Sequence, residues 1–154
     1  MICIPSAQKD EKMPKLELVG LDKLKPHESV DFIHLIKLKE EIRSDGFLKL
    51  AIAIDKDTHI ILDGHHRVAA LKELGCMKIP AVFVDYSSSD IKVQSQRNPL
   101  KLTKKRIIKA AMSSKKLPPQ TSRHMIRING NWKHISAIEK KVNIPLGELR
   151  GNSK

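Results

Sequence analysis

The feature that most constrains the fold is a polar turn, Asp63-Gly64-His65-His66-Arg67, between an apolar run over 60–62 and a helical pattern over 68–74. This order predicts a strand, a tight turn and a helix. The first N–H groups of the helix, and the positive end of its dipole, then lie at the turn and favour an anion there, phosphate above all. Two histidines and an arginine take the place of the acids usual in a first helical turn, and these cations become favourable when a phosphate binds.

The length of the chain, 154 residues, predicts one compact domain with a small appendage. Two isolated cysteines, Cys3 and Cys76, are too few for a disulfide framework. No apolar run is long enough to span a membrane, and no signal-peptide pattern opens the chain. We therefore expect a cytoplasmic protein with no membrane partner. The sequence does not determine its oligomeric state.

The positive charge of the chain is concentrated in its last third. The net charge is +12. Residues 1–100 hold 15 Lys and Arg against 15 Asp and Glu, whereas residues 101–154 hold 14 Lys and Arg against only Glu139 and Glu148. This asymmetry predicts an anionic partner, either nucleic acid bound through residues 101–154 or the phosphates of a nucleotide. A solvated basic surface explains the charge equally well.

The hydrophobic pattern predicts a small mixed sheet with helices packed on it, which is an α+β fold, followed by a basic, partly helical C-terminal segment. The expected strands cover 16–24 (with a turn at its end), 48–54, 59–62 and 78–86, and the expected helices cover 31–45 and 64–74. A connector with one extended piece follows over 87–102, and Thr103 is expected to cap a third helix. Beyond it we expect a loop over 115–128, a short helix over 134–141 and a closing turn over 145–149.

The turn at 63–67, together with the upstream Lys25-Pro26-His27-Glu28, resembles the ParB/sulfiredoxin-like fold and, within it, the archaeal free-serine kinases. Three later blocks extend the resemblance and are not shared by chromosome-partition ParB proteins: 102–105 (LTKK), 118–124 (PPQTSRH) and 144–149 (IPLGEL). The longer euryarchaeal kinases carry a large insert where this chain has a short connector. The choice of phosphoryl donor is therefore left open.

The resemblance implies a kinase that transfers a phosphoryl group from ATP or ADP, with Mg²⁺, to the hydroxyl of free L-serine, giving O-phosphoserine. The residues predict a flexible tail over 1–14 and a connector over 87–102. The resemblance implies a ParB/sulfiredoxin-like nucleotide-binding core over 15–86 and a basic substrate-binding segment over 103–154. Such a reaction requires positioning, charge neutralisation and a base for the hydroxyl proton.

Two carboxylates are the expected catalytic residues. The resemblance makes Glu28 the base, although its position near the start of a helix is also favourable to the helix dipole. Asp63 is expected to cap the helix over 64–74, and the resemblance adds a catalytic part, the orientation of substrate or of a metal ion. Asp63 is accordingly the one candidate metal ligand. A zinc site is not expected, because no His pair stands at i,i+4 and no Cys or Glu is near to complete one.

The expected phosphate and nucleotide contacts come from the same turn. Gly64 allows the backbone to approach phosphate closely, and His65, His66 and Arg67 are expected to donate to phosphate oxygens. Adjacent helical side chains diverge by about 100°, so both histidines do not reach one atom. Lys49 is a further candidate for nucleotide binding. The resemblance assigns the serine substrate and its new phosphate to Thr121, Ser122, Arg123 and His124.

Other functions are compatible with part of the sequence. The main alternative is a ParB-like DNA-binding protein or nuclease with nucleotide hydrolysis activity, whose binding would fall steeply with salt. No helix-turn-helix follows residue 86, which counts against partition-type recognition. A non-catalytic nucleotide-binding regulator is a further alternative. A sulfinic-acid reductase is excluded because the turn at 63–67 holds no thiol. P-loop and Rossmann signatures are absent.

Overall fold

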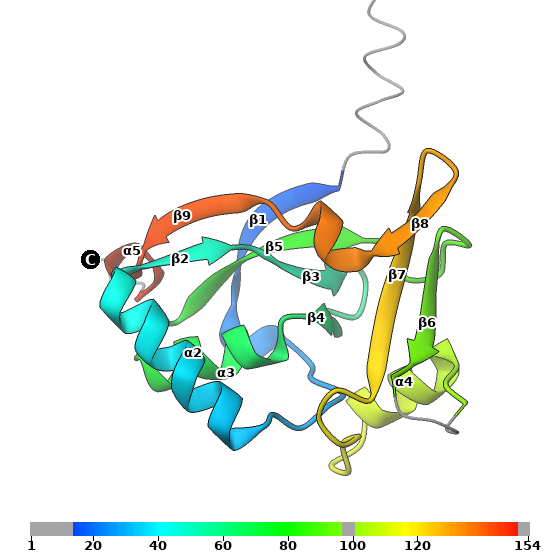
Figure 1. Cartoon of the computed structure of the whole chain (residues 1–154), viewed down its shortest axis with the longest axis horizontal. Helices are drawn as coiled ribbons and strands as arrows, with labels where there is room; N and C mark the ends of the chain where they lie inside the picture. Colours follow the sequence, from blue (N-terminus) through cyan, green and yellow to red (C-terminus); the bar gives the residue numbers. More distant parts are fainter. Residues whose placement is uncertain (1–13, 97–100, 151–154) are drawn as a thin grey trace, which may run out of the picture.

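A computed structural model of the chain describes residues 14–96 and 101–150. Its centre is a four-stranded sheet in the order β1 (Lys15–Gly20), β5 (Lys78–Val84), β3 (Ile52–Asp55) and β4 (Ile61–Asp63). β3 and β5 run parallel and the other neighbours run antiparallel, so the sheet is mixed, as predicted. Helices α2 (Phe32–Asp45) and α3 (His65–Glu73) lie side by side on one side of it (Figure 1). The predicted α+β fold is confirmed.

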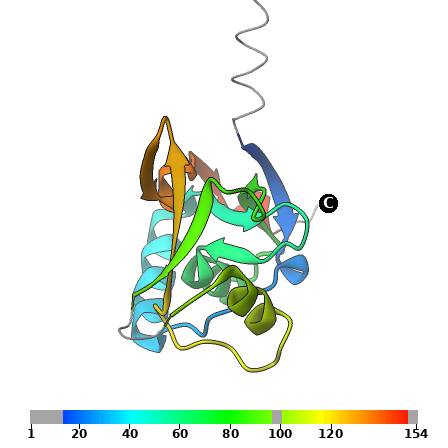
Figure 2. The ribbon, with the colours of Figure 1, turned by 90° about the vertical axis from the view of Figure 1, so that its right-hand side faces the viewer.

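The remaining elements add two small sheets. One pairs β2 (Phe47–Leu50) with β9 (Lys141–Pro145), and the other has the order β6 (Ile91–Ser95), β7 (Ser122–Ile128) and β8 (Asn131–His134). Figure 2 views the molecule from the side that holds this second sheet and α4 (Lys104–Ala111). The short helices are η1 (Leu21–Lys23), η2 (Ile135–Ile138) and α5 (Leu146–Leu149). None of the helices in the described ranges has the length and apolar character that a membrane span requires.

Two hydrophobic cores lie on opposite faces of the central sheet. Alternate residues of the buried strand β3 serve both, because successive side chains of a strand point to opposite faces. Ile52 and Ile54 join the core formed with α2, α3 and α5. Ala53, together with Ala51 just before the strand, joins the core formed with α4, β7 and η2. Cys76 is buried in the first core, and Cys3 lies outside the described residues.

The helix boundaries follow the local signals. The Asp31 carboxylate accepts a hydrogen bond from Ile33 N at the start of α2, and Gly46 ends that helix with a φ of 83°. The Thr103 hydroxyl accepts from Arg106 N at the start of α4, so the predicted cap is confirmed. Each of these residues acts on backbone groups at the end of its own helix, either by accepting their hydrogen bonds or by ending the helical conformation. A local sequence pattern is therefore sufficient to predict these boundaries.

Four expectations about the elements are wrong. The strand over 48–54 is two strands, because β2 pairs with β9 while β3 pairs with β4 and β5. The loop over 115–128 contains β7, whose inward positions include a histidine that disguises the alternation. The helix over 134–141 is the single 3-10 turn of η2, after which the chain extends into β9. The closing turn over 145–149 is the helix α5.

Candidate active site

The polar turn lies between β4 and α3, as predicted, and it depends on Gly64. This residue has a φ of 117°, and a Cβ placed on it would lie 2.4 Å from Ile52 Cγ2 in the strand beneath. The expected cap by Asp63 is wrong, because no side chain caps α3. Asp63 ends β4 and pairs instead with Arg67, at 3.2 Å. The amides that begin the helix are thus left without a side-chain acceptor, and such amides bind anions.

A cavity of about 420 Å³ opens beside this turn. Its volume is within the range of small-molecule sites. Asp63, Gly64, His66 and Arg67 form one end of it, and Ser136 and Glu139 reach it from the C-terminal third of the chain. The other wall comes from α2 and β2: His34, Leu38, Glu41, Ile42, Asp45, Phe47, Leu48, Lys49 and Leu50. Lys49 is half-exposed there, and its Nζ lies 3.6 Å from Asp45 and 3.9 Å from Glu41.

The guanidinium of Arg67 is held by protein oxygens on several sides. Nη1 donates to the Ala51 carbonyl at 2.7 Å, and Nη2 donates to Glu139 Oε1 at 2.9 Å and to Asp63 Oδ2 at 3.2 Å. The side chain is only 16% exposed. Arg67 therefore joins the residue before β3, the polar turn and the segment after η2, in addition to lining the cavity.

Glu139 is a residue of this site that the sequence analysis missed. Its side chain is 1% exposed, and burial, followed by the neighbouring Asp63, raises its pKa to about 9. Its Oε2 receives no bond from an N–H or O–H donor of the described residues, and its carboxyl group interacts with that of Asp63. A hydrogen bond between two carboxyl groups requires a proton on one of them, and the raised pKa places that proton on Glu139. The sequence signal that could have identified Glu139 is that it is one of only two acidic residues in the basic segment 101–154.

The two histidines of the turn fasten the segment that carries Glu28. His65 Nε2 accepts a hydrogen bond from His27 N at 3.1 Å, and His66 Nε2 accepts from Asp31 N at 2.9 Å. A ring nitrogen that accepts carries no proton, so neither Nε2 donates to a phosphate in this arrangement. The predicted divergence of the pair is confirmed, since His65 is buried whereas His66 lines the cavity and stacks on His34.

Burial acts in the same direction on both of these rings. It lowers the pKa of His65 well below its ordinary value, with the neighbouring His27 adding to the effect. Burial lowers the pKa of His66 as well, followed by the charge of His34. Both rings are therefore neutral near pH 7, which suits acceptors of backbone N–H groups.

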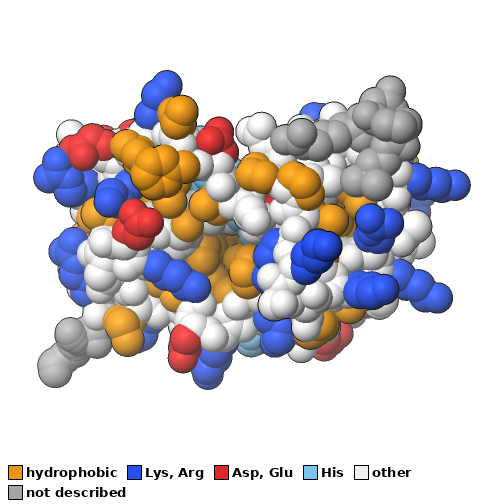
Figure 3. All heavy atoms as spheres, turned by 90° about the horizontal axis from the view of Figure 1, so that it is seen from below, with side chains coloured by type: hydrophobic (Ala, Val, Ile, Leu, Met, Phe, Trp, Pro, Cys, Tyr) orange, Lys and Arg blue, Asp and Glu red, His pale blue; other side chains and the backbone are white. Residues whose placement is uncertain are grey.

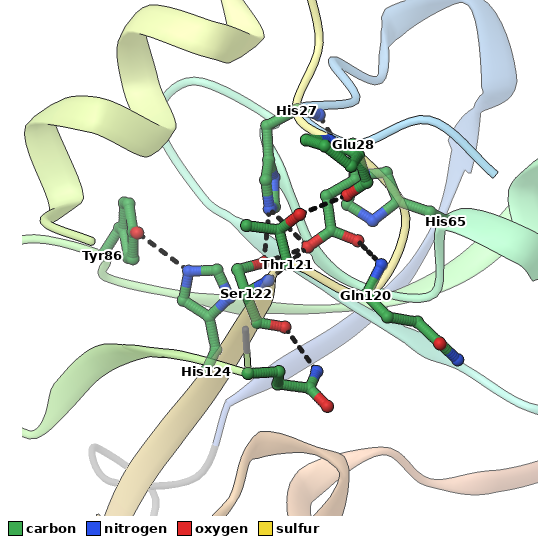
Figure 4. Close-up of polar contacts among 10 residues, drawn as sticks. His27, Glu28, His65, Tyr86, Gln120, Thr121, Ser122 and His124 are labelled. Atoms are coloured by element: carbon green, nitrogen blue, oxygen red, sulfur yellow. Dashed lines mark hydrogen bonds and ion pairs between the residues drawn. The ribbon is translucent and has the colours of Figure 1, made fainter. Parts of the chain in front are cut away.

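The Glu28 carboxylate is held by the segment that begins β7 (Figure 4). Oε1 accepts from Gln120 N at 3.1 Å, and Oε2 accepts from Ser122 N at 2.8 Å and from the Ser122 hydroxyl. Burial raises the pKa of Glu28 and outweighs the opposing effect of these hydrogen bonds, and the charge of Asp63 raises it further. A carboxylate that has a raised pKa and an orientation fixed by hydrogen bonds has the properties of a general base.

A buried polar cluster continues beyond Glu28. His27 Nε2 lies 2.9 Å from Ser122 Oγ, and the Tyr86 hydroxyl lies 2.8 Å from His124 Nε2 (Figure 4). The rings of His27 and His124 are 5.6 Å apart in an edge-on contact. Burial lowers the pKa of His27 to about 4 and that of His124 to about 3, so both are neutral near pH 7. No role of His27 or Tyr86 was predicted from the sequence.

The four residues predicted to hold the substrate do not all lie together. Ser122 and His124 are on one face of β7, in the cluster around Glu28. Arg123 is on the opposite, exposed face, with its Nε 3.3 Å from the sulfur of Met125. Thr121 is buried, and its hydroxyl donates to the Pro118 carbonyl at 2.6 Å. The period of the strand separates Arg123 from its neighbours.

The comparisons with known proteins agree with this architecture. Residues 5–98 match the model of the ParB N-terminal domain. The chain is 40% identical over 82 residues to an ATP-dependent L-serine kinase of Staphylothermus marinus (51% of this chain, 32% of the relative). It is 36% identical over 96 residues to an ADP-dependent L-serine kinase of Thermococcus kodakarensis (54% and 40%). The matches thus span between 32% and 40% of the length of these curated relatives.

Solved structures extend the likeness of the fold. A free serine kinase in complex with AMP superposes with a TM-score of 0.71 at 18% identity, over 89% of this chain and 94% of that one. At this identity the likeness concerns the fold alone. The family match covers more than half of the sequence, and it includes Glu28, the polar turn and the whole central sheet. The chain belongs to the ParB N-terminal domain family.

Proposed function

We propose that this chain is a kinase that transfers a phosphoryl group from ATP or ADP to the hydroxyl of free L-serine. The observation that carries the proposal is the arrangement of Glu28. A largely buried carboxylate with a raised pKa is fixed next to a polar turn whose helix begins with uncapped amides. A base beside an anion-binding helix start is what a phosphoryl transfer to an alcohol requires. The names of the curated relatives support the same reaction.

In the proposed reaction the nucleotide lies in the cavity with its phosphates toward the amides of residues 65–67. The serine hydroxyl binds at Glu28, and its oxygen attacks the terminal phosphorus in line with the leaving oxygen. The new O–P bond forms as the bond to the leaving phosphate breaks. The hydroxyl proton passes to Glu28. Arg67, fixed by Glu139 and Asp63, keeps a positive charge at the wall of the cavity throughout.

The residues at the cavity also fit a Mg²⁺ ion. Kinases hold Mg²⁺ by one or two carboxylates together with phosphate oxygens. The Asp63 carboxyl lines the cavity, and its oxygens are ligands of the kind that Mg²⁺ prefers. Asp63 would hold the ion against the nucleotide phosphates. When bound there, Mg²⁺ would neutralise charge on the group being transferred.

The decisive experiment looks for O-phosphoserine. The purified chain is incubated with L-serine, Mg²⁺ and either ATP or ADP, and the product is followed by ³¹P NMR. We expect product with at least one nucleotide, and we expect Glu28→Gln to abolish it while nucleotide binding persists. Glu17→Gln is the matched control, since Glu17 is an exposed carboxylate of β1. Absence of O-phosphoserine with both nucleotides would refute the proposal.

A second candidate function, binding of nucleic acid through residues 101–154, is favoured by one surface. Lys105, Arg106 and Lys109 are exposed on α4, and Figure 3 shows Lys and Arg side chains on the half of the molecule that holds this helix. If this surface binds duplex DNA, the logarithm of the affinity falls linearly with that of the salt concentration. Fluorescence anisotropy with a labelled duplex measures the slope. A variant in which all three of these cations are replaced by Ala should lose this salt dependence of binding.

A further inference from the structure

One hydroxyl of the chain already lies where the proposed reaction needs a hydroxyl. The Ser122 hydroxyl donates to Oε2 of Glu28, the oxygen that would receive the proton of an alcohol substrate. The substrate of the proposed reaction is itself a serine, so Ser122 presents the same functional group to the same base. This inference rests on the proposed function and concerns a second acceptor at that site.

The Ser122 hydroxyl is also positioned as a nucleophile. Its oxygen lies 2.9 Å from His27 Nε2, and because its one proton is donated to Glu28, the His27 ring donates its Nε2–H to that oxygen and orients it. His27 is held in turn, because its backbone N–H donates to His65 in the polar turn. The backbone N–H of Ser122 donates to Glu28 as well, which fixes the start of β7 against the base. A hydroxyl beside a base that a third group orients is the usual arrangement of an activated serine.

The neighbouring hydroxyls are directed elsewhere. Thr121 is fully buried and donates to the Pro118 carbonyl at 2.6 Å. Ser136 lines the cavity, but its hydroxyl lies 2.9 Å from His134 Nδ1. Ser122 is partly exposed, so a phosphoryl donor is not excluded by burial. Among the hydrogen bonds of the described part of the chain, Ser122 supplies the hydroxyl that contacts Glu28.

We propose that, in the absence of free serine, the chain transfers the terminal phosphoryl group of its nucleotide to its own Ser122. Oγ forms the new O–P bond, the bond between that phosphorus and the leaving phosphate of the nucleotide breaks, and the hydroxyl proton passes to Glu28. The phosphate then stands beside the Glu28 carboxylate, where like charges repel and the alcohol site is filled. Phosphorylation of Ser122 therefore inhibits transfer to free serine, and free serine protects Ser122.

The test uses the full chain with Mg²⁺ and ATP or ADP, with and without excess L-serine. Intact mass spectrometry reports the gain of a phosphoryl group and tandem spectrometry locates it, while O-phosphoserine is measured in parallel. We expect one group on Ser122, formed at a rate independent of protein concentration and suppressed by L-serine. Glu28→Gln should abolish it, and Ser29→Ala, at an exposed serine beside Glu28, should leave it unchanged.

Two variants of Ser122 separate chemistry from folding. Ser122→Ala should remove the label, and Ser122→Thr, which keeps a hydroxyl, should carry phosphothreonine. Formation of O-phosphoserine when L-serine is present, with no label on Ser122 when L-serine is left out, overturns this inference and leaves the proposed function standing. A label that survives Glu28→Gln, or that lies on another residue, also overturns it. Absence of both products refutes the proposed function and the inference together.

Discussion

The substitution Glu139→Gln should make the protein more stable at neutral pH, although it replaces a buried carboxyl partner of Arg67. The protonated glutamate and the glutamine amide have nearly the same shape. The amide oxygen of the introduced glutamine would accept from Arg67 Nη2, as Glu139 Oε1 does at 2.9 Å. The amide NH₂ would donate to Asp63, in place of the proton that Glu139 must otherwise bind. The variant therefore keeps the contacts and loses only the titration.

The size of the effect follows from the pKa. The folded state raises the pKa of Glu139 from 4.5 to about 9, so between these values the folded chain holds a proton that the unfolded chain releases. The free energy of unfolding then falls as the pH rises, by about 1.4 kcal/mol per pH unit from this group. Between pH 4.5 and pH 7 the loss is about 3 kcal/mol, and Glu139→Gln avoids it.

Urea unfolding at several pH values measures this difference directly. The free energies of the two proteins should be similar near pH 4.5 and should diverge steadily toward pH 9, with Glu139→Gln the more stable. Taking the difference cancels the other titrating groups, which both proteins share. Glu148→Gln is the matched control, because Glu148 is the other acid of the last third and is exposed. A difference that does not change with pH would show that Glu139 is ionised and refute the reasoning.

Three further predictions concern the turn, a helix cap and the base. Gly64→Ala should lower the free energy of unfolding by about 2–5 kcal/mol, because of left-handed backbone strain and the contact with Ile52. The matched control Gly75→Ala, at a φ of 81° with open space around it, should lower it by about 1–2 kcal/mol. Equal losses of the two variants in urea unfolding would contradict this reasoning. Thr103→Ala should cost about 1 kcal/mol and lower the melting temperature by several degrees in calorimetry; an unchanged transition would show that the cap contributes nothing. Because burial raises the pKa of Glu28, kcat/KM should fall on acidification with a midpoint above 4.5, and a midpoint at or below 4.5 would exclude it as the base.

Several elements were predictable because their signals are local. Asp31 and Gly46 bracket α2 within one stretch of sequence, and Thr103 caps α4 from the adjacent position. The polar turn was likewise evident, since an apolar run, a glycine and a helical pattern follow one another there. Such signals satisfy backbone groups a few residues away, so the tertiary structure has little opportunity to override them.

Strand pairing was not predictable in the same way. The residues around Ala51 do not indicate that one apolar run divides into β2 and β3. The division arises because β2 pairs with β9, whereas β3 pairs with β4 and β5. In β7 a buried histidine occupies an inward position usually held by an apolar residue, and it is stable there because Tyr86 bonds to it. A polar residue can take a core position when a distant partner satisfies it, and a single sequence does not show the partner.

The sequence by itself determined the polar turn and the helices that flank it, and the resemblance drew attention to Glu28. Only the tertiary structure decided which groups surround them. Glu28 meets Ser122 across 94 positions and Arg67 meets Glu139 across 72. The helix signals act through hydrogen bonds between near neighbours, whereas these contacts exist only after the strands have paired and buried both partners. Burial raises the pKa of Glu28 and of Glu139, so their chemistry is a property of the folded chain.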